Sequence, residues 1–182
     1  MYLIEATERV MLRRLAAAEV QGAQVSTLPT SSGSATLTMK LPNAAASDTA
    51  ARILSEQFTF DIRLELPGAN PDKLDSSEWQ PTALTGSSLQ WLQVIASSST
   101  GEVGVELELT PSGRKALGNI FKGNTGKHVG IFVRDLLVSK LKIDSEKVSD
   151  HIIISGIPSE KVAEIFADDV NVGLRVSFSQ TH

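Results

Sequence analysis

Two different periods of apolar and polar side chains run through the first third of the chain. Residues 3–20 place apolar side chains at helical spacing and contain neither Gly nor Pro, which predicts an amphipathic helix. Residues 35–41 and 58–66 alternate apolar and polar side chains, which is typical of strands with one buried face. A shorter strand is expected at 23–28, before Pro29.

A helix is predicted between the two alternating strands. Ser47 and Asp48 are good N-caps for it, and the helix is expected to run through Gln57 with an apolar face of Ala51, Ile53, Leu54 and Phe58. A strand, a helix and a second strand within about 30 residues suit a right-handed parallel crossover. We therefore expect residues 1–66 to form one small α+β lobe, and the alternating segment 170–178 could complete its sheet as a final strand.

Hydrophobic patterning stops after this lobe. Between Pro67 and residue 83 the chain is rich in Gly, Pro, Asn, Asp and Ser, which predicts a linker. We expect the segment 67–83 to join two lobes and to bend as a hinge at Pro67, Gly68 and Pro71.

The remaining pattern predicts a second lobe at 84–169. Thr110 followed by Pro111 is a typical helix start, with Thr as the N-cap and Pro in the first turn. Helices are expected at 110–121 and 158–167, and strands at 89–95, 103–109, 129–133, 136–143 and 152–155. The predicted fold class is α+β, with two small lobes that each pack a mixed or antiparallel sheet against helices.

Composition narrows the classes of function. The formal net charge is −4, whereas a general nucleic-acid binder is usually basic, so we expect no nucleic-acid partner. The absence of Cys excludes disulfides and thiolate metal sites. No apolar stretch approaches the ~20 residues that span a bilayer, and the first residues lack the pattern of a signal peptide. We expect membrane contact only through segments absent from this chain.

Charge is unevenly distributed in the second lobe. Seven basic residues and one acid lie in 111–142, whereas seven acids and two lysines lie in 143–170. Either a solvated, self-complementary surface or a charged partner would explain this asymmetry. The two tryptophans are either exposed anchors for a partner or buried residues that fix the lobe junction. The candidate partner-contact residues are Trp79, Trp91, Arg114, Lys115, Lys122 and Lys127.

Residues that could support catalysis or ligand binding follow no recognised pattern. The segment 123–128, GNTGKH, lacks the first Gly and the final Ser or Thr of a phosphate-binding loop, and it follows a predicted helix rather than a strand. The three histidines share no spacing that would bring them together. Asp168 and Asp169 fall just past a predicted helix end, in a stretch expected to be exposed. We expect no enzyme activity, no metal and no cofactor.

Four segments of the second half carry a resemblance to a known family. They are LTGSSL at 84–89, VELELTPSGRKALGNIF at 105–121, NTGKHVGIFVRD at 124–135 and IIISGIPSEKVAEIF at 152–166. Their order and spacing resemble the first extracytoplasmic domain of the SecD/SecDF protein-export membrane proteins. That domain has a base next to the membrane and a head inserted into it. The resemblance implies a ferredoxin-like base at 1–66 and a SecD-type head at 84–169.

One departure from the family concerns the predicted hairpin between the strands at 129–133 and 136–143. The family's turn reads Asp-Gly, whereas this chain has Asp135 followed by Leu136. Leu cannot supply the positive φ that Gly adopts at low cost, so we expect a different turn.

The resemblance implies a non-enzymatic accessory role in Sec-dependent protein export, in the periplasm or at the outer face of the plasma membrane. The implied partners are the unfolded preprotein and Sec translocase subunits. The alternative is a stand-alone interaction or adaptor domain of the same fold that binds a folded partner, which the charge asymmetry would favour.

Overall fold

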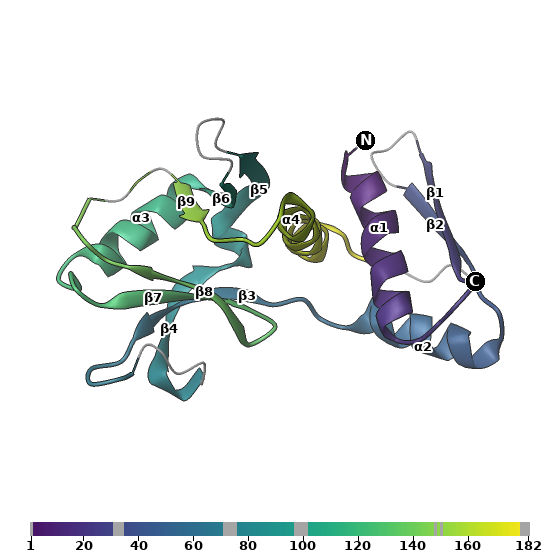
Figure 1. Cartoon of the computed structure of the whole chain (residues 1–182), viewed down its shortest axis with the longest axis horizontal. Coiled ribbons are helices and arrows are strands. Elements are labelled where there is room, and N and C mark those ends of the chain that lie inside the picture. Colours follow the sequence, from purple (N-terminus) through teal and green to yellow (C-terminus); the bar gives the residue numbers. More distant parts are fainter. Residues whose placement is uncertain are drawn as a thin grey trace. The chain divides into compact units, whose positions relative to one another are not determined.

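The computed structural model describes residues 2–30, 35–70, 76–96, 102–147, 149 and 151–178. The contacts within it divide the chain into two units. The smaller unit comprises residues 1–57 and 171–182, and the larger unit comprises residues 58–170. Their elements are labelled in Figure 1.

The smaller unit packs two helices and a two-stranded antiparallel sheet around one core. Its elements are α1 (Tyr2–Ala17), β1 (Gln24–Pro29), β2 (Ala35–Lys40) and α2 (Ala44–Ser55). Figure 1 shows α1 beside the β1–β2 hairpin. The core joins one face of α1 to one face of α2 and to a residue near the end of the chain; it comprises Ala6, Val10, Met11, Leu15, Ala50, Ile53 and Val172.

The larger unit contains two antiparallel sheets, with the strand orders β4–β3–β7–β8 and β5–β6–β9. Its strands are β3 (Phe60–Glu65), β4 (Trp79–Thr85), β5 (Leu89–Ala96), β6 (Val103–Leu109), β7 (His128–Val133), β8 (Leu136–Lys142) and β9 (His151–Ile154). Its other elements are the helix α3 (Pro111–Phe121), most of α4 (Glu160–Arg175), and the short 3-10 turns η1 (Ser76–Glu78) and η2 (Gly86–Ser88). The predicted α+β class with two small sheet-and-helix lobes is confirmed.

The start of α3 is fixed against the turn η2. Thr110 is the N-cap, as predicted, and its hydroxyl accepts a hydrogen bond from the Gly113 N–H at 3.1 Å. The Thr110 N–H donates to the Ser88 carbonyl at 2.9 Å, and Leu84, just before η2, is fully buried. Two of the segments that carry the family resemblance, 84–89 and 105–121, therefore fold against each other.

The strand predicted at 170–178 is wrong, because helix α4 continues to Arg175. The buried side chains of Ala163, Ala167 and Val170 are four and three residues apart, which is the spacing of one helix face. A short apolar run such as 170–176 fits both the helical and the strand period, and here the helix propagates through it. Asp168 lies inside this helix and is buried, not exposed as expected.

The predicted parallel crossover within residues 35–66 is also wrong. Strand β2 pairs with β1, whereas β3 pairs with β4 and β7 in the larger unit, and every one of these pairings is antiparallel. Alternation identifies a strand but not its neighbour, because partner choice depends on contacts between distant segments. The described sheet of the smaller unit accordingly has two strands, fewer than a ferredoxin-like sheet.

Part of the predicted linker is a strand. Residues 79–83 belong to β4, which pairs with β3, and the Leu66 N–H donates to the Glu78 carbonyl at 3.0 Å. The sequence does not predict this strand because Pro81 interrupts the alternation of apolar and polar residues. Proline is tolerated here since β4 is the outer strand of its sheet.

Helix α2 begins earlier than predicted. Its N-cap is Asn43, whose side-chain oxygen accepts from the Ala46 N–H at 2.9 Å, so neither Ser47 nor Asp48 is the cap. Asn, Asp and Ser are all good caps, and the sequence offers three of them within six residues. Ala46, whose N–H makes the capping hydrogen bond, is buried.

Candidate partner-binding surfaces

Two of the three predicted hinge residues, Pro67 and Gly68, lie inside the larger unit. Pro67 and Gly68 are in the connection from β3 to β4, where Gly68 has a φ of +76° and the Ala69 N–H donates to the Leu66 carbonyl at 3.1 Å. Pro71 falls outside the described residues. The chain passes between the two units elsewhere, after Gln57 and after Val170.

Trp79 is a core residue and presents no surface to a partner. Its side chain is 3% exposed, and its ring meets the ring of Phe132 edge-to-face at 5.8 Å between centroids. Gly130 makes room for it, because a Cβ there would lie 2.9 Å from Trp79 Cε3. Of the two roles considered for this residue, the buried one is correct. Its contacts with Phe132 and Gly130 lie within the larger unit.

Trp91 lies on the outer face of the β5–β6–β9 sheet. It pairs with Glu108 of β6, which pairs with His151 of β9, so the three side chains form one row across the sheet. Trp91 is half-buried, and both of the other residues are exposed. Trp91 is thus the tryptophan that keeps part of its surface exposed on this face of the sheet.

A second row lies beside the first on this outer face. Gln93 pairs with Glu106, and Glu106 pairs with Ile153. The Gln93 side-chain amide donates to Glu106 Oε2 at 2.7 Å, and His151 Nδ1 lies 3.1 Å from Glu106 Oε1. The carboxylate of Glu106 is therefore already engaged within the sheet.

The four basic candidates divide into two structural and two exposed residues. Arg114 donates to the Leu109 carbonyl at 3.2 Å, and Lys127 Nζ donates to Asn124 Oδ1 at 2.8 Å, so both side chains hold local structure. Lys115 and Lys122 are exposed. Lys115 lies within α3, and Lys122 is the C-cap residue that follows the helix.

The GNTGKH segment forms a turn that uses its own polar groups. Gly123 and Gly126 have φ values of +71° and +91°, and the Gly126 N–H donates to the Ile143 carbonyl at 2.8 Å. The side-chain amide of Asn124 donates to the Ile120 carbonyl at 2.7 Å. This hydrogen bond satisfies a carbonyl in the last turn of α3. These groups shape the route from α3 to β7.

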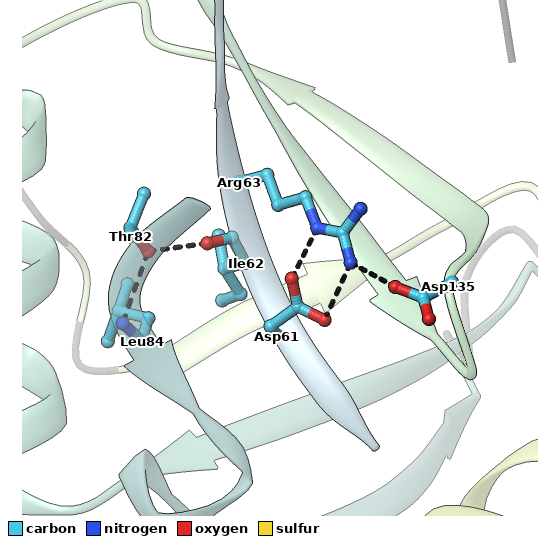
Figure 2. A network of polar contacts seen from close by, with 6 residues as sticks. All are labelled: Asp61, Ile62, Arg63, Thr82, Leu84 and Asp135. Carbon is cyan, nitrogen blue, oxygen red and sulfur yellow. Dashed lines mark hydrogen bonds and ion pairs between the residues drawn. The ribbon is translucent and has the colours of Figure 1, made fainter. Parts of the chain in front are cut away.

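A polar network, which local patterning does not predict, joins strand β3 to the turn of the β7–β8 hairpin. Figure 2 shows the Arg63 guanidinium between the carboxylates of Asp61 and Asp135, with ion pairs to both. The Arg63 Cζ atom also lies 4.2 Å from the centroid of the Phe132 ring. Asp61 and Arg63 come from one strand and Asp135 from a turn 72 residues later, so only the folded chain brings them together.

The turn of this hairpin is made by Arg134 and Asp135, and Leu136 already belongs to strand β8. Arg134 and Asp135 both have positive φ, +50° and +62°, and Val133 pairs directly with Leu136. Two left-handed residues in a two-residue loop are the geometry of a type I′ turn. Asp135 tolerates this conformation and is held by Arg63, so Leu136 does not have to adopt it.

Strand β8 is an outer strand that exposes apolar side chains. Leu136 is 71% exposed and Val138 is 43% exposed, while Lys140 and Lys142 are exposed further along the same face. The alternate side chains of the strand are half-buried. Lysines on an outer strand commonly discourage pairing with other chains, whereas the exposed apolar half favours contact.

Histidines and carboxylates form pairs but no larger cluster in the part of the chain that the structure describes. His128 Nδ1 lies 2.8 Å from Glu65 Oε2, which also accepts from the His128 N–H at 2.7 Å. Across residues 2–178, with the gaps given above, no group of three or more His, Cys, Asp or Glu side chains is placed to hold a metal ion. Within the same ranges, no helix combines the length and the apolar character needed to cross a bilayer.

Comparisons with known proteins identify the fold. No protein-family model and no curated protein matches the chain. A structure described as a membrane component SecDF that enhances protein export aligns with a TM-score of 0.59 and 20% identity, over 99% of this chain and 92% of that one. SecDF from Thermus thermophilus, a translocon-associated membrane protein, aligns with a TM-score of 0.57 and 18% identity over 95% of this chain.

A third solved structure, SecDF in a super-membrane-facing form, aligns with a TM-score of 0.56 and 20% identity over 95% of this chain. The chain spans about a quarter of the two longer SecDF chains, 26% and 27%. At these identities the likeness concerns the fold. The chain has the fold of the SecD/SecDF periplasmic domain, and the resemblance predicted from its sequence is confirmed at that level.

Proposed function

We propose that this chain is a non-enzymatic accessory part of Sec-dependent protein export that contacts the translocating, unfolded polypeptide on the extracytoplasmic side. The observation that supports the proposal most strongly is the SecDF fold over almost the whole chain. In this proposal the smaller unit corresponds to the base and the larger unit to the head.

The larger unit offers surfaces that suit an unfolded partner. An extended polypeptide carries unpaired N–H and C=O groups, and an outer strand such as β8 can pair with them without reading sequence. Leu136 and Val138 add exposed apolar contact at the same strand. Backbone pairing with β8 and apolar contact with Leu136 and Val138 both require an extended partner with exposed backbone and apolar side chains. An unfolded chain offers these groups, whereas a folded protein buries most of them.

Binding to one protein in two states tests the proposal. We expect the purified chain to bind a reduced, carboxymethylated and permanently unfolded protein in a labelled-probe anisotropy titration, and not to bind the native form of that protein. Equal binding of both forms, or no binding of the unfolded form, would contradict the proposal. Tight, strongly salt-dependent capture of one folded protein would instead favour the adaptor alternative.

Localisation provides a second test. We expect the full-length product to fractionate with the cell envelope and to be accessible to protease added from the extracytoplasmic side. Residence in the cytoplasm would contradict a role beside the translocase.

A further inference from the structure

The outer face of the β5–β6–β9 sheet has one position suited to a cationic side chain. Trp91 and Glu108 are directly opposite each other, and side chains in such pairs are about 5 Å apart at Cβ. The Glu108 carboxylate is exposed and makes no hydrogen bond or ion pair within the described residues, whereas that of Glu106 is engaged by Gln93 and His151. An indole beside an available carboxylate attracts Lys or Arg through both cation–π and ion-pair contact.

The same face has an apolar position further along the strands. Ile95 pairs with Gly104, and a Cβ at Gly104 would lie 3.5 Å from Ile95 Cγ1 and 3.4 Å from Ile153 Cγ2. The two isoleucine side chains thus approach each other over a glycine, and Ile153 is 46% exposed. Together they form an apolar patch without a bulky residue at its centre.

The spacing of these two positions fits an extended chain. Trp91 and Ile95 are four residues apart on β5, which corresponds to about 13 Å along a strand. Side chains on one face of an extended peptide repeat every second residue, so positions i and i+4 of the peptide span the same length.

We propose that this outer face binds extended polypeptide segments in which a Lys or Arg is followed or preceded, four residues away, by an apolar residue. Trp91 and Glu108 hold the cation, and Ile95 and Ile153 receive the apolar side chain. The inference rests on the proposed function for the nature of the occupant, an unfolded polypeptide, and adds a preference for basic over acidic segments. Such a preference is opposite to the one expected of the lysine-bearing β8 strand.

Tryptophan fluorescence reports on this face directly. The chain has two tryptophans, and Trp79 is in the core, so a Trp79→Phe variant leaves Trp91 as the single reporter. Two soluble peptides are titrated that differ only in carrying Lys or Glu at the charged position, with Leu four residues away. We expect the Lys peptide to change the Trp91 emission and to bind at least about five-fold more tightly than the Glu peptide, with the difference decreasing in high salt.

Substitutions at Glu108 test its role against a matched control. Glu108→Gln is expected to weaken binding of the Lys peptide about three-fold, and Glu108→Lys is expected to reverse the preference between the peptides. Glu164→Lys makes the same charge change at an exposed position on α4, where Glu164 is 3.8 Å from Lys161, and is expected to leave the preference unchanged. Equal effects of the two Lys substitutions would overturn the proposal, because they would indicate a response to net charge alone.

A labelled-peptide anisotropy titration of the unmodified chain keeps the test independent of the Trp79→Phe variant. If unfolded protein binds but Glu108 and Trp91 substitutions have no effect, the outer-face inference fails and the proposed function stands. If neither the unfolded protein nor either peptide binds, the proposed function itself fails.

Discussion

Arg63 connects strand β3 to the turn of the β7–β8 hairpin. Its side chain is 12% exposed and joins the carboxylates of Asp61 and Asp135 to the face of Phe132. The turn that Asp135 occupies places two non-glycine residues at positive φ, at a cost of about 1–2 kcal/mol each. The contacts of Arg63 offset part of that cost and so preserve the register of β8.

Arg63→Met is therefore expected to destabilise the protein by about 1–3 kcal/mol, because it leaves the half-buried Asp61 carboxylate without its cation. Asp135→Asn is expected to cost less, about 0.5–1 kcal/mol, since Asn tolerates positive φ and the lost pair is largely exposed. Urea unfolding of the three proteins measures both values. An Asp135→Asn variant less stable than Arg63→Met would contradict this ranking.

The pH dependence of this contribution follows from the same contacts. The hydrogen bond from Arg63 to Asp61 is the largest cause that raises the pKa of the guanidinium above its ordinary value. A raised pKa of a cation gives stability that is fully present below the unfolded pKa and is lost only as the pH rises through the folded pKa. The stability difference between wild type and Arg63→Met should thus stay constant from about pH 6 to pH 9. A steady fall over that range, measured by urea unfolding, would show that another group titrates with it.

At Gly113 the turn η2 leaves no room for a larger side chain. A Cβ at this position would lie 2.4 Å from the Ser88 carbonyl oxygen, which is backbone and cannot rotate away. In a helix, Gly→Ala normally gains up to about 1 kcal/mol, but overpacking against backbone costs about 1–3 kcal/mol or more. We expect Gly113→Ala to lower the midpoint of thermal unfolding, and Lys115→Ala, on the exposed side of α3, to leave it within a degree or two.

At the level of elements, the start of α2 shows that a residue type favoured as an N-cap does not always become the cap. Asn43 makes the capping hydrogen bond, and Ser47 and Asp48 lie within the helix. Asn43→Ala should cost about 1 kcal/mol, whereas Ser47→Ala should be neutral or slightly stabilising, since Ala is the better helix former. Circular dichroism during urea unfolding compares them. A larger loss for Ser47→Ala would place the cap where the sequence first suggested it.

Strands β3 and β4 show why local patterning identifies elements better than it identifies their partners. The alternation of β3 predicts a strand, but its neighbours are β4 and β7 and not β2. Strand β4 has no such alternation, because Pro81 and the polar residues around it resemble a linker. Both outcomes are set by hydrogen bonding to a distant strand, which no local window contains.

For the whole molecule, the division into two units predicts that two probes of unfolding can disagree. Both tryptophans, Trp79 and Trp91, belong to the larger unit, whereas circular dichroism senses the helices of both units. Met11→Ala removes a fully buried side chain from the core of the smaller unit, at an expected cost of about 2–5 kcal/mol. It should lower the circular dichroism midpoint and leave the tryptophan transition nearly unchanged.

The matched control removes a buried side chain from the other unit. Leu107→Ala, in β6, should shift the tryptophan transition by a similar amount. If either variant moved both transitions together, the two units would unfold as one cooperative body. That result would contradict a base and a head that unfold independently.

Most helices and strands, the N-cap of α3, the α+β class and the SecDF-like fold can be predicted from the residues alone. These depend on periodicity, local capping and the order of short motifs, which adjacent residues encode. The folded chain was needed to show that residues 170–175 continue a helix, that β3 pairs within the larger unit, and that Trp79 is buried whereas Trp91 is half-buried. It also brought Arg63 to Asp135 and Trp91 to Glu108. Such outcomes depend on which distant surfaces meet, and the free energy of those contacts outweighs the small differences between local alternatives.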